Sequence, residues 1–294
     1  MLYTIENDKI RVEISDKGAE LQSIVGKKTG FEYLWQGDSK YWGNRATVLF
    51  PICGRLTEGK YTYEGKEYEM VLHGFARNSV FEVIAQNKES ITLELKSSEE
   101  SRKIYPFDFT FRMTYTLDKA SVKNEFTVIN DGKGELPFSV GGHPGFNIPF
   151  AEGEAFEDYF ITFKEKCAPK KLIMSPTCYY TGKDEDFKLK CGKRFDLKHE
   201  LFSNDAIFLK ETDHTVSLKS SKNKRAVTVE FSDKLTHVGF WQKPNSDAPY
   251  VCIEPWSGVP AYDGIVDDFK TKNLLTHLPA GETYENWFTI TITE

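Results

Sequence analysis

The stretch Phe107–Leu117, FDFTFRMTYTL, gives the clearest indication of the fold. Apolar and aromatic side chains occupy every second position, and Asp, Thr and Arg fill the positions between them. This period of two is typical of a β-strand with one buried face and one solvated face. The side chains expected on the buried face are Phe107, Phe109, Phe111, Met113, Tyr115 and Leu117.

The same period recurs in short segments along the whole chain, and no sustained helical period accompanies it. Many short half-buried strands separated by turns are typical of an antiparallel sandwich or barrel. The sequence therefore predicts an all-β protein with a large antiparallel β-sandwich. The segments that repeat the pattern most clearly are Ile10–Ile14, Ile91–Leu95, Val122–Val128 and Phe288–Ile292.

Turn signals and loops complete this outline. Glu64-Gly65 and Asn130-Asp131-Gly132 are typical of hairpin corners. The stretch Ala151–His199 is rich in Lys, Asp and Glu and shows little alternation, so we expect long loops there, which could include an excursion at a sheet edge. No low-complexity linker divides the chain, and all-β folds often reach this length as one domain. We therefore expect a single domain over residues 1–294.

Composition and charge narrow the possible partners. The net charge is -6, and local Lys clusters have acidic residues among them, which argues against nucleic acid and anionic membrane as partners. The N-terminus has no signal-peptide pattern, and no apolar run reaches the length of a membrane span. The number of cysteines is odd and none form a C-x-x-C pair, so we expect free thiols in the cytoplasm. The cysteines are Cys53, Cys167, Cys178, Cys191 and Cys252.

Polar residues stand among Gly and Pro in four segments, where rigid turns could aim a side chain at a ligand. In the first two, Arg55 follows Gly54, and His73 precedes Gly74 with Arg77 three residues after that glycine. Arg55 could donate to hydroxyl or carboxylate oxygens, or form a surface ion pair. His73 could donate to a polar substrate, or cap a turn. The segments are Phe50–Arg55, Leu72–Arg77, Gly141–Phe146 and Tyr250–Trp256.

The third and fourth segments carry the other candidates. His143 follows two glycines and precedes Pro-Gly, a setting that is hard to interpret as a plain strand and favours a functional histidine. Glu254 shares a strand face with Tyr250 and Cys252 and is expected to leave the strand before Pro255. A carboxylate beside a large ring such as Trp256 suits a sugar, although a glutamate at a strand exit is an equally good interpretation.

Metal and nucleotide chemistry have weaker support. Two histidines and a glutamate could ligate a metal, but no two of them have close spacing such as H-E-x-x-H. The sequence also lacks a Gly-rich phosphate loop, a G-x-S-x-G turn and a dinucleotide fingerprint. We therefore expect neither a metal nor a cofactor.

Taken in order, the four segments resemble the aldose 1-epimerase (galactose mutarotase) family across essentially the whole chain. The similarity is greatest to a divergent bacterial branch, that of the lactose-operon X protein, because of Glu32–Asp38, His73–Arg77 and Glu254–Trp256. Three positions depart from classical mutarotases: Leu56–Glu58 after Arg55, Phe75 after Gly74, and Pro255-Trp256 after the late Glu. These departures bear on the identity of the sugar more than on the chemistry.

The resemblance implies a large β-sandwich that interconverts the α and β anomers of a hexose without a cofactor. It assigns Glu254 as the base, His143 as the acid and His73 as a supporting donor. Reference pKa values of about 4.3 for Glu and 6.5 for His suit an ionised base and a titratable acid. It also implies that four residues bind the sugar or line the pocket: Arg55, Asp205, Arg77 and Trp241.

Two other functions remain open at this level. Arg55 and Arg77 could meet a phosphate, which would make the protein a hexose 6-phosphate 1-epimerase. A carbohydrate-binding or sensing protein could have kept the pocket and lost turnover. The retention of Glu254 and both histidines argues against this last alternative, because binding alone needs no acid–base pair. The sequence does not indicate the oligomeric state.

Overall fold

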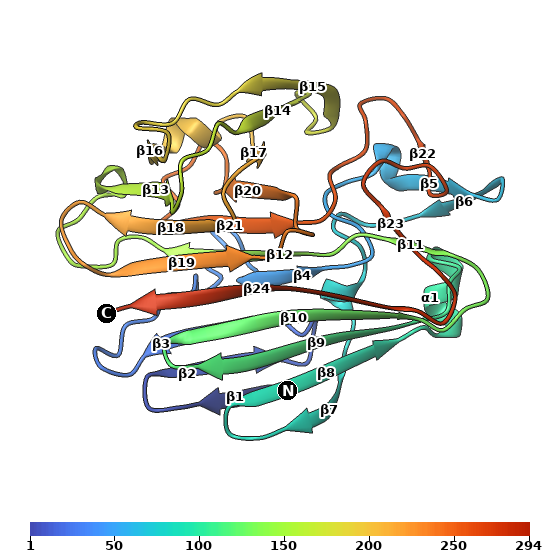
Figure 1. Cartoon of the computed structure of the whole chain (residues 1–294), viewed down its shortest axis with the longest axis horizontal. Coiled ribbons are helices and arrows are strands. Elements are labelled where there is room, and N and C mark those ends of the chain that lie inside the picture. Colours follow the sequence, from blue (N-terminus) through green and yellow to red (C-terminus); the bar gives the residue numbers. More distant parts are fainter.

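Two large antiparallel sheets form the body of the molecule in the computed structural model, which describes residues 1–294 (Figure 1). The predicted all-β sandwich is confirmed. The nine-stranded sheet has the order β16 (Arg194–Asp196), β13 (Tyr159–Phe163), β18 (Thr215–Ser220), β19 (Ala226–Phe231), β24 (Thr283–Thr293), β10 (Ser121–Asn130), β9 (Phe109–Asp118), β8 (Ser90–Lys96) and β7 (Glu82–Gln86). The seven-stranded sheet has the order β15 (Tyr180–Asp186), β14 (Lys170–Met174), β17 (Ile207–Lys210), β20 (His237–Trp241), β21 (Tyr250–Trp256), β12 (Gly141–Asn147) and β4 (Ala46–Leu49).

Three small sheets flank this sandwich, and one of them contains the parallel pair β22–β5. The longest helix, α1, covers only Glu99–Ile104, and no helix has the length and hydropathy that a membrane span requires. The small sheets are β1 (Leu2–Glu6), β2 (Ile10–Ser15) and β3 (Leu21–Gly26); β11 (Leu136–Phe138) and β23 (Thr276–Leu278); and β22 (Asp267–Asp268), β5 (Lys60–Tyr63) and β6 (Lys66–Glu69).

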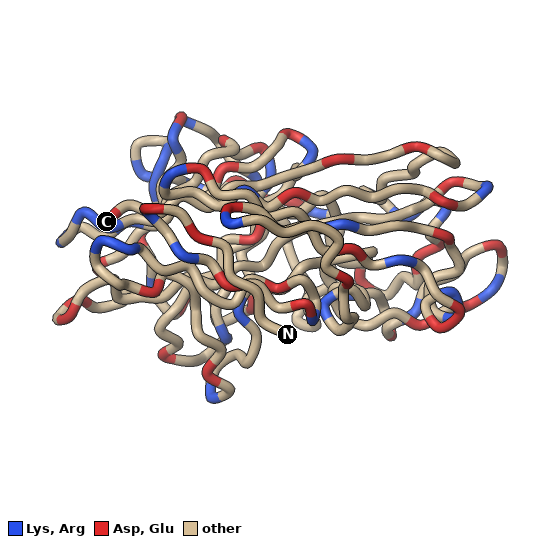
Figure 2. The backbone as a smooth tube through the Cα atoms, turned by 90° about the horizontal axis from the view of Figure 1, so that it is seen from below, with Lys and Arg blue, Asp and Glu red and all other residues tan.

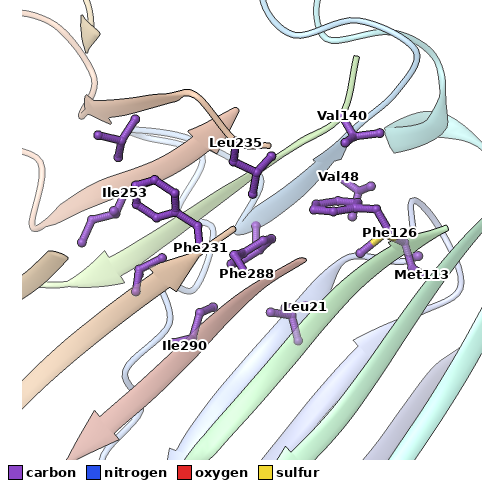
Figure 3. Close-up of a cluster of buried hydrophobic side chains, with 14 of the residues drawn as sticks. Leu21, Val48, Met113, Phe126, Val140, Phe231, Leu235, Ile253, Phe288 and Ile290 are labelled. Atoms are coloured by element: carbon purple, nitrogen blue, oxygen red, sulfur yellow. The ribbon is translucent and has the colours of Figure 1, made fainter. Parts of the chain in front are cut away.

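The core lies between the two large sheets, as the close-up in Figure 3 shows. Phe126 and Phe288 enter it from the nine-stranded sheet, and Val48 and Ile253 enter it from the seven-stranded sheet. All four side chains are at most 4% exposed. Burial of such apolar surface is the dominant favourable contribution to folding, so this layer holds the two sheets together.

The nine-stranded sheet follows the predicted alternation. In β10 every second residue is buried, and in β24 the pattern is the same from Asn286 onward. Its outer face carries cross-strand polar pairs such as Thr92 and Thr114, whose hydroxyl oxygens lie 3.0 Å apart. One expected boundary was wrong: β9 begins at Phe109, so Phe107 lies outside the strand.

Only one of the two expected hairpin corners is confirmed. Glu64-Gly65 joins β5 to β6, because Tyr63 pairs with Lys66. Asn130–Gly132 is not a hairpin, because β11, the next strand, pairs with β23 instead of β10. The Asn130 side chain donates to backbone oxygens of Gly134 and Leu278, so it stabilises an irregular crossing between sheets.

The expectation that long loops dominate Ala151–His199 was wrong, whereas the excursion at a sheet edge is confirmed. This stretch contains β13 to β16, which form the edges of both large sheets. Charged side chains mask the strands: Lys171 Nζ lies 2.9 Å from Glu185 Oε1 across the β14–β15 pair. Edge strands commonly carry such charges, which discourage further strand pairing. Figure 2 shows Lys and Arg interspersed with Asp and Glu along the whole chain.

The seven-stranded sheet is buried on both faces near its centre. Every residue of β4 and β21 is buried, and so is every residue of β12 except Asn147. The chain around His143 is therefore a strand, and β21 continues through Pro255 to Trp256, contrary to both sequence expectations. Gly142 permits this packing, because a Cβ there would lie 2.6 Å from the Phe288 ring.

Candidate active site

A cavity of about 320 Å³ opens on the face of the seven-stranded sheet that is turned away from the core. Its volume is near the lower limit of the roughly 300–1,000 Å³ found for small-molecule sites. Its walls come from β4, β12, β17, β20 and β21 and from the loops around them. All seven candidate site residues line this cavity: Arg55, His73, Arg77, His143, Asp205, Trp241 and Glu254.

Glu254 and His143 face each other across neighbouring strands at the base of the cavity. Gly141 pairs with Trp256 and Gly145 with Cys252, which places His143 opposite Glu254 in the register. His143 Nε2 lies 3.4 Å from Glu254 Oε1, and the two side chains are 9% and 1% exposed. A carboxyl and an imidazole this close can exchange a proton with each other or with a bound ligand.

Burial changes the ionisation of this pair from the reference values. It raises the pKa of the Glu254 carboxyl well above its usual range, and the charge of Asp205 adds to the effect. It lowers the pKa of His143 to about 3, although a backbone hydrogen bond partly opposes this. Both groups therefore favour their neutral forms in the free cavity, because a low dielectric disfavours charge. This differs from the reference values, which suit an ionised Glu254 beside a titratable histidine.

His73 is held by two hydrogen bonds to the same glycine. Its backbone N–H donates to the Gly54 carbonyl at 2.8 Å, and the Gly54 N–H donates to His73 Nδ1 at 3.1 Å. Since Nδ1 accepts, the ring proton must be on Nε2, which makes the ring a donor there. Burial lowers the pKa of His73 well below its usual value, and the charges of Arg77 and Arg55 add to this effect. It is therefore a neutral hydrogen-bond donor.

The loop that carries His73 has an unusual backbone. His73 has a φ of 65°, and Gly74 follows with a φ of 74°. A Cβ at Gly74 would lie 2.2 Å from the Phe50 carbonyl oxygen, so only glycine fits there. Left-handed backbone at a non-glycine residue costs about 1–3 kcal/mol and is often found at ligand sites.

The mouth of the cavity has a more exposed polar group formed by Arg55, Asp205 and Trp241. The Trp241 indole N–H donates to Asp205 Oδ1 at 2.6 Å, and Arg55 Nη2 lies 3.6 Å from Asp205 Oδ2. Asp205 has a φ of 75°, and its side chain is 27% exposed. Arg55 also donates to the Thr177 carbonyl at 3.1 Å. These contacts hold the carboxylate in place at the mouth of the cavity, where part of it stays exposed.

Sequence reasoning missed several residues of the cavity wall. Trp42 packs against His143 with ring centroids 4.8 Å apart, and it comes from a loop that has no periodic signal. Thr47 is the polar residue within the buried strand β4, a break in the apolar pattern that could have identified it. Phe208 and Cys178 also line the cavity, and nothing in their local sequence indicates this.

Two residues of the cavity, His143 and Glu254, form a set of possible metal ligands with the buried Cys252 beneath them. Donor atoms of His143, Cys252 and Glu254 all lie within 4.8 Å of one another. Burial raises the pKa of the Cys252 thiol well above its usual value, whereas metals bind the thiolate. In the free protein the Cys252 thiol and the Glu254 carboxyl therefore favour their protonated forms, and a metal would bind only with release of these protons.

Comparison with known proteins agrees with this fold. The family model described as aldose 1-epimerase matches residues 1–291. The chain belongs to the aldose 1-epimerase family. The plasmid-encoded protein LacX of Lactococcus lactis subsp. lactis is 35% identical over 268 residues, which cover 88% of each chain. The predicted resemblance to the LacX branch is thus confirmed.

Structural and more distant relatives support the same family. The crystal structure of a galactose mutarotase related enzyme from Lactobacillus acidophilus has a TM-score of 0.93 and 38% identity, with 100% of this chain and 98% of that chain covered. The galactose mutarotase of Sus scrofa is 24% identical over 261 residues, which cover 81% of this chain and 71% of that protein. Enzymes of this kind are isomerases, so the family places this chain among isomerase-like proteins.

Proposed function

We propose that the protein interconverts the α and β anomers of a free hexose by opening and closing the sugar ring. The observation that carries this proposal is the buried pair of Glu254 and His143, 3.4 Å apart, at the base of a cavity large enough for one sugar. The name of the porcine relative makes galactose a natural first substrate to test.

Ring opening requires two proton movements. The Glu254 carboxylate takes the proton of the C1 hydroxyl, while the protonated His143 gives a proton to the ring oxygen as the C1–O5 bond breaks. The open aldehyde rotates about C1–C2, and the ring closes on the other face of the carbonyl. His143 then takes the proton back, and Glu254 returns its proton to the new C1 hydroxyl. No proton is gained or lost over the cycle.

The perturbed pKa values are compatible with these roles. A protonated Glu254 with a neutral His143 holds the same number of protons as a carboxylate with an imidazolium. Sugar hydroxyls that donate to Glu254 favour its carboxylate form, because hydrogen bonds to the charged form lower a pKa. A carboxylate with a raised pKa is a stronger base, and an imidazolium with a lowered pKa is a stronger acid.

The other cavity residues hold the sugar in this account. His73, whose Nε2 carries the ring proton, donates to the ring oxygen or to a neighbouring hydroxyl. Asp205 accepts from hydroxyls at the mouth, where Trp241 and Arg55 hold it in place. Arg77 and Trp241 contribute to the wall.

A second candidate function rests on Arg77. Its guanidinium is largely desolvated, which lowers its pKa, and the nearby Glu20 lies beyond ion-pair distance. A cation that lines a cavity without a carboxylate partner suits an anionic group on the substrate. This observation favours a hexose 6-phosphate as the alternative to a free hexose.

Polarimetry on freshly dissolved α-glucose, α-galactose and α-glucose 6-phosphate tests both candidates. We expect the protein to accelerate the approach to anomeric equilibrium far above the spontaneous rate, most strongly for a free hexose. A larger kcat/KM for the phosphate ester would favour the second candidate. Sugar binding by calorimetry without any acceleration would overturn the catalytic proposal and identify a binding protein.

A further inference from the structure

We infer that Thr47 is a substrate-binding residue whose hydroxyl contacts the sugar next to its reacting bond, an inference that rests on the proposed function. Thr47 lies in β4, is 3% exposed and lines the cavity. Its cross-strand partner in the β4–β12 pair is His143. Directly paired residues project from the same face of a sheet, so the two side chains are neighbours at the base of the cavity.

The Thr47 hydroxyl has no hydrogen-bond partner in the free protein. Six buried side-chain polar atoms in the chain lack one, and three belong to the cavity: Thr47 Oγ1, His143 Nδ1 and Glu254 Oε1. The other three are His214 Nδ1, 2.9 Å from Asp233 Oδ1, Asp267 Oδ2, 3.0 Å from Lys272 Nζ, and Asn124 Oδ1. Glu254 Oε1 likewise faces His143 Nε2 at 3.4 Å, so Thr47 Oγ1 and His143 Nδ1 are the cavity atoms without any polar neighbour of this kind.

The unpartnered hydroxyl lowers the stability of the folded protein, so stability does not explain why position 47 is a threonine. The other residues of β4 are Ala46, Val48 and Leu49, so position 47 lies within an apolar strand. A buried polar atom without a hydrogen-bond partner is unfavourable for a folded protein. Valine has nearly the same shape as threonine and would avoid this cost. Residues that break a local rule of stability often serve a ligand.

The chemistry of the site indicates which part of a sugar Thr47 meets. The hydroxyl is both donor and acceptor, so it can bind a sugar hydroxyl in either direction. Because its neighbour His143 acts on the C1–O5 bond in the proposed reaction, the hydroxyls within reach are those flanking that bond, at C2 or C6. A buried group that binds a substrate hydroxyl discriminates strongly against the analogue that lacks it.

Two substitutions at position 47 separate the hydroxyl from the shape of the side chain. We expect Thr47→Val to lower kcat/KM for the best hexose by about 10-fold to 100-fold, because a buried hydrogen bond to the substrate is lost. We expect Thr47→Ser, which keeps the hydroxyl, to stay within about 3-fold of the wild type. We also expect Thr47→Val to raise the melting temperature, since it removes an unpartnered polar atom. A residue with a purely structural role would not lose activity while gaining stability.

A matched control and deoxy sugars complete the experiment. Thr114→Val on the outer face of the nine-stranded sheet removes the pair with Thr92, and we expect unchanged kcat/KM and a slightly lower melting temperature. With Thr47→Val, the penalty for either 2-deoxyglucose or 6-deoxyglucose relative to glucose should shrink by about 10-fold, as in a double-mutant cycle.

The possible outcomes separate this inference from the proposed function. If the wild type turns over sugar and Thr47→Val keeps full activity and full discrimination, the inference is overturned and the function stands. If the wild type binds glucose or galactose by calorimetry without turnover, a weaker affinity of Thr47→Val supports the inference, while an unchanged affinity overturns it. If the wild type neither binds nor turns over these sugars, both proposals are overturned.

Discussion

Two buried glutamates, one on each large sheet, behave in opposite ways. Glu94 on the nine-stranded sheet has a side chain that is 6% exposed, and Glu254 on the seven-stranded sheet has one that is 1% exposed. Burial would raise the pKa of both. At Glu94, hydrogen bonds from Lys96 and Arg112 outweigh burial, and the pKa is lowered. At Glu254 no cation intervenes, and the pKa is raised.

The comparison shows that the neighbouring cations and hydrogen-bond donors, more than burial, distinguish a structural carboxylate from a reactive one. Glu94 Oε1 lies 2.9 Å from Lys96 Nζ, and Glu94 Oε2 lies 2.6 Å from Arg112 Nε, so its charge is satisfied within the protein. Glu254 Oε1 has only a neutral histidine nearby and no hydrogen bond. A buried carboxyl without a cation or a hydrogen-bond donor suits a site where the substrate provides the hydrogen bonds.

The largest expected effect concerns the histidine beside Glu254. His143→Gln removes the proposed acid and should lower kcat by about 10²–10⁴-fold, the usual contribution of a positioned proton-transfer group. Progress curves from polarimetry, with circular dichroism to verify folding, measure this effect. His214, which pairs with Asp233 at the surface, provides the control: His214→Gln should leave kcat unchanged. Equal losses in both variants would contradict the role of His143.

A smaller effect is expected on stability, and it distinguishes the two glutamates. Glu94→Gln should lower the free energy of unfolding by about 1–2 kcal/mol, because two cations lose a charged partner that is only partly screened by solvent. Glu254→Gln should not lower it, because the carboxyl is already neutral in the fold. Urea denaturation at neutral pH measures both values.

The two variants should also differ in how their stability depends on pH. The lowered pKa of Glu94 contributes stability above its ordinary value, and this contribution is lost as the pH falls through the folded pKa. The raised pKa of Glu254 contributes stability below its ordinary value, and this is lost as the pH rises through the folded pKa. The difference in the free energy of unfolding between the wild type and Glu94→Gln should therefore become smaller in acid. Glu254→Gln should become more stable relative to the wild type as the pH rises above about 4.5. If the stabilities of the two variants changed with pH in the same direction relative to the wild type, the contrast between Glu94 and Glu254 would be contradicted.

Residues at the mouth of the cavity should contribute less to kcat/KM than residues at its base. Trp241→Phe removes the indole N–H that donates to Asp205 at 2.6 Å and keeps an aromatic ring in the wall. We expect kcat/KM to fall by roughly 3-fold to 10-fold, in line with one hydrogen bond of about 1 kcal/mol. The change should be in KM more than in kcat, since Asp205 binds hydroxyls and transfers no proton. A fall in kcat alone would contradict this assignment.

The smallest expected effect is a nearly flat response to acid. Because the pKa of His143 is lowered to about 3, the pair keeps its single proton well below the pH at which an ordinary glutamate and histidine would gain a second one. We expect kcat/KM to change by no more than about twofold between pH 6 and pH 3.5, where a glutamate with an ordinary pKa of about 4.3 would cost at least about fivefold. A loss of activity centred near pH 4.3 would mean that the free cavity does not hold the pair in neutral form.

The sequence predicted the nine-stranded sheet better than the seven-stranded sheet for a physical reason. Strands β9, β10 and β24 have one face in the core and one in solvent, so their residues alternate. Strands β4, β12 and β21 are buried on both faces, and their second face is the wall of the cavity. Alternation cannot appear where both faces avoid water, which is why His143 was not recognised as part of a strand.

The candidate site shows a similar division. Glu254, His143 and His73 could be identified because their neighbours are glycine, proline or tryptophan, in an order that resembles a family. Trp42 could not, because only the path of the loop before β4 brings it to His143. Thr47 is a polar break in an apolar strand, but only the pairing of β4 with β12 places it beside His143. The perturbed ionisation of the pair also could not be predicted, since it depends on the depth of the cavity.

The measurement that tests the account most directly compares Glu254→Gln with Glu94→Gln in the same polarimetric assay. Both substitutions replace a buried carboxyl by an amide of the same shape. The account predicts that Glu254→Gln lowers kcat/KM for α-galactose or α-glucose by at least about 10²-fold, while Glu94→Gln stays within about twofold of the wild type. Full mutarotation activity in Glu254→Gln would contradict the assignment of Glu254 as the base.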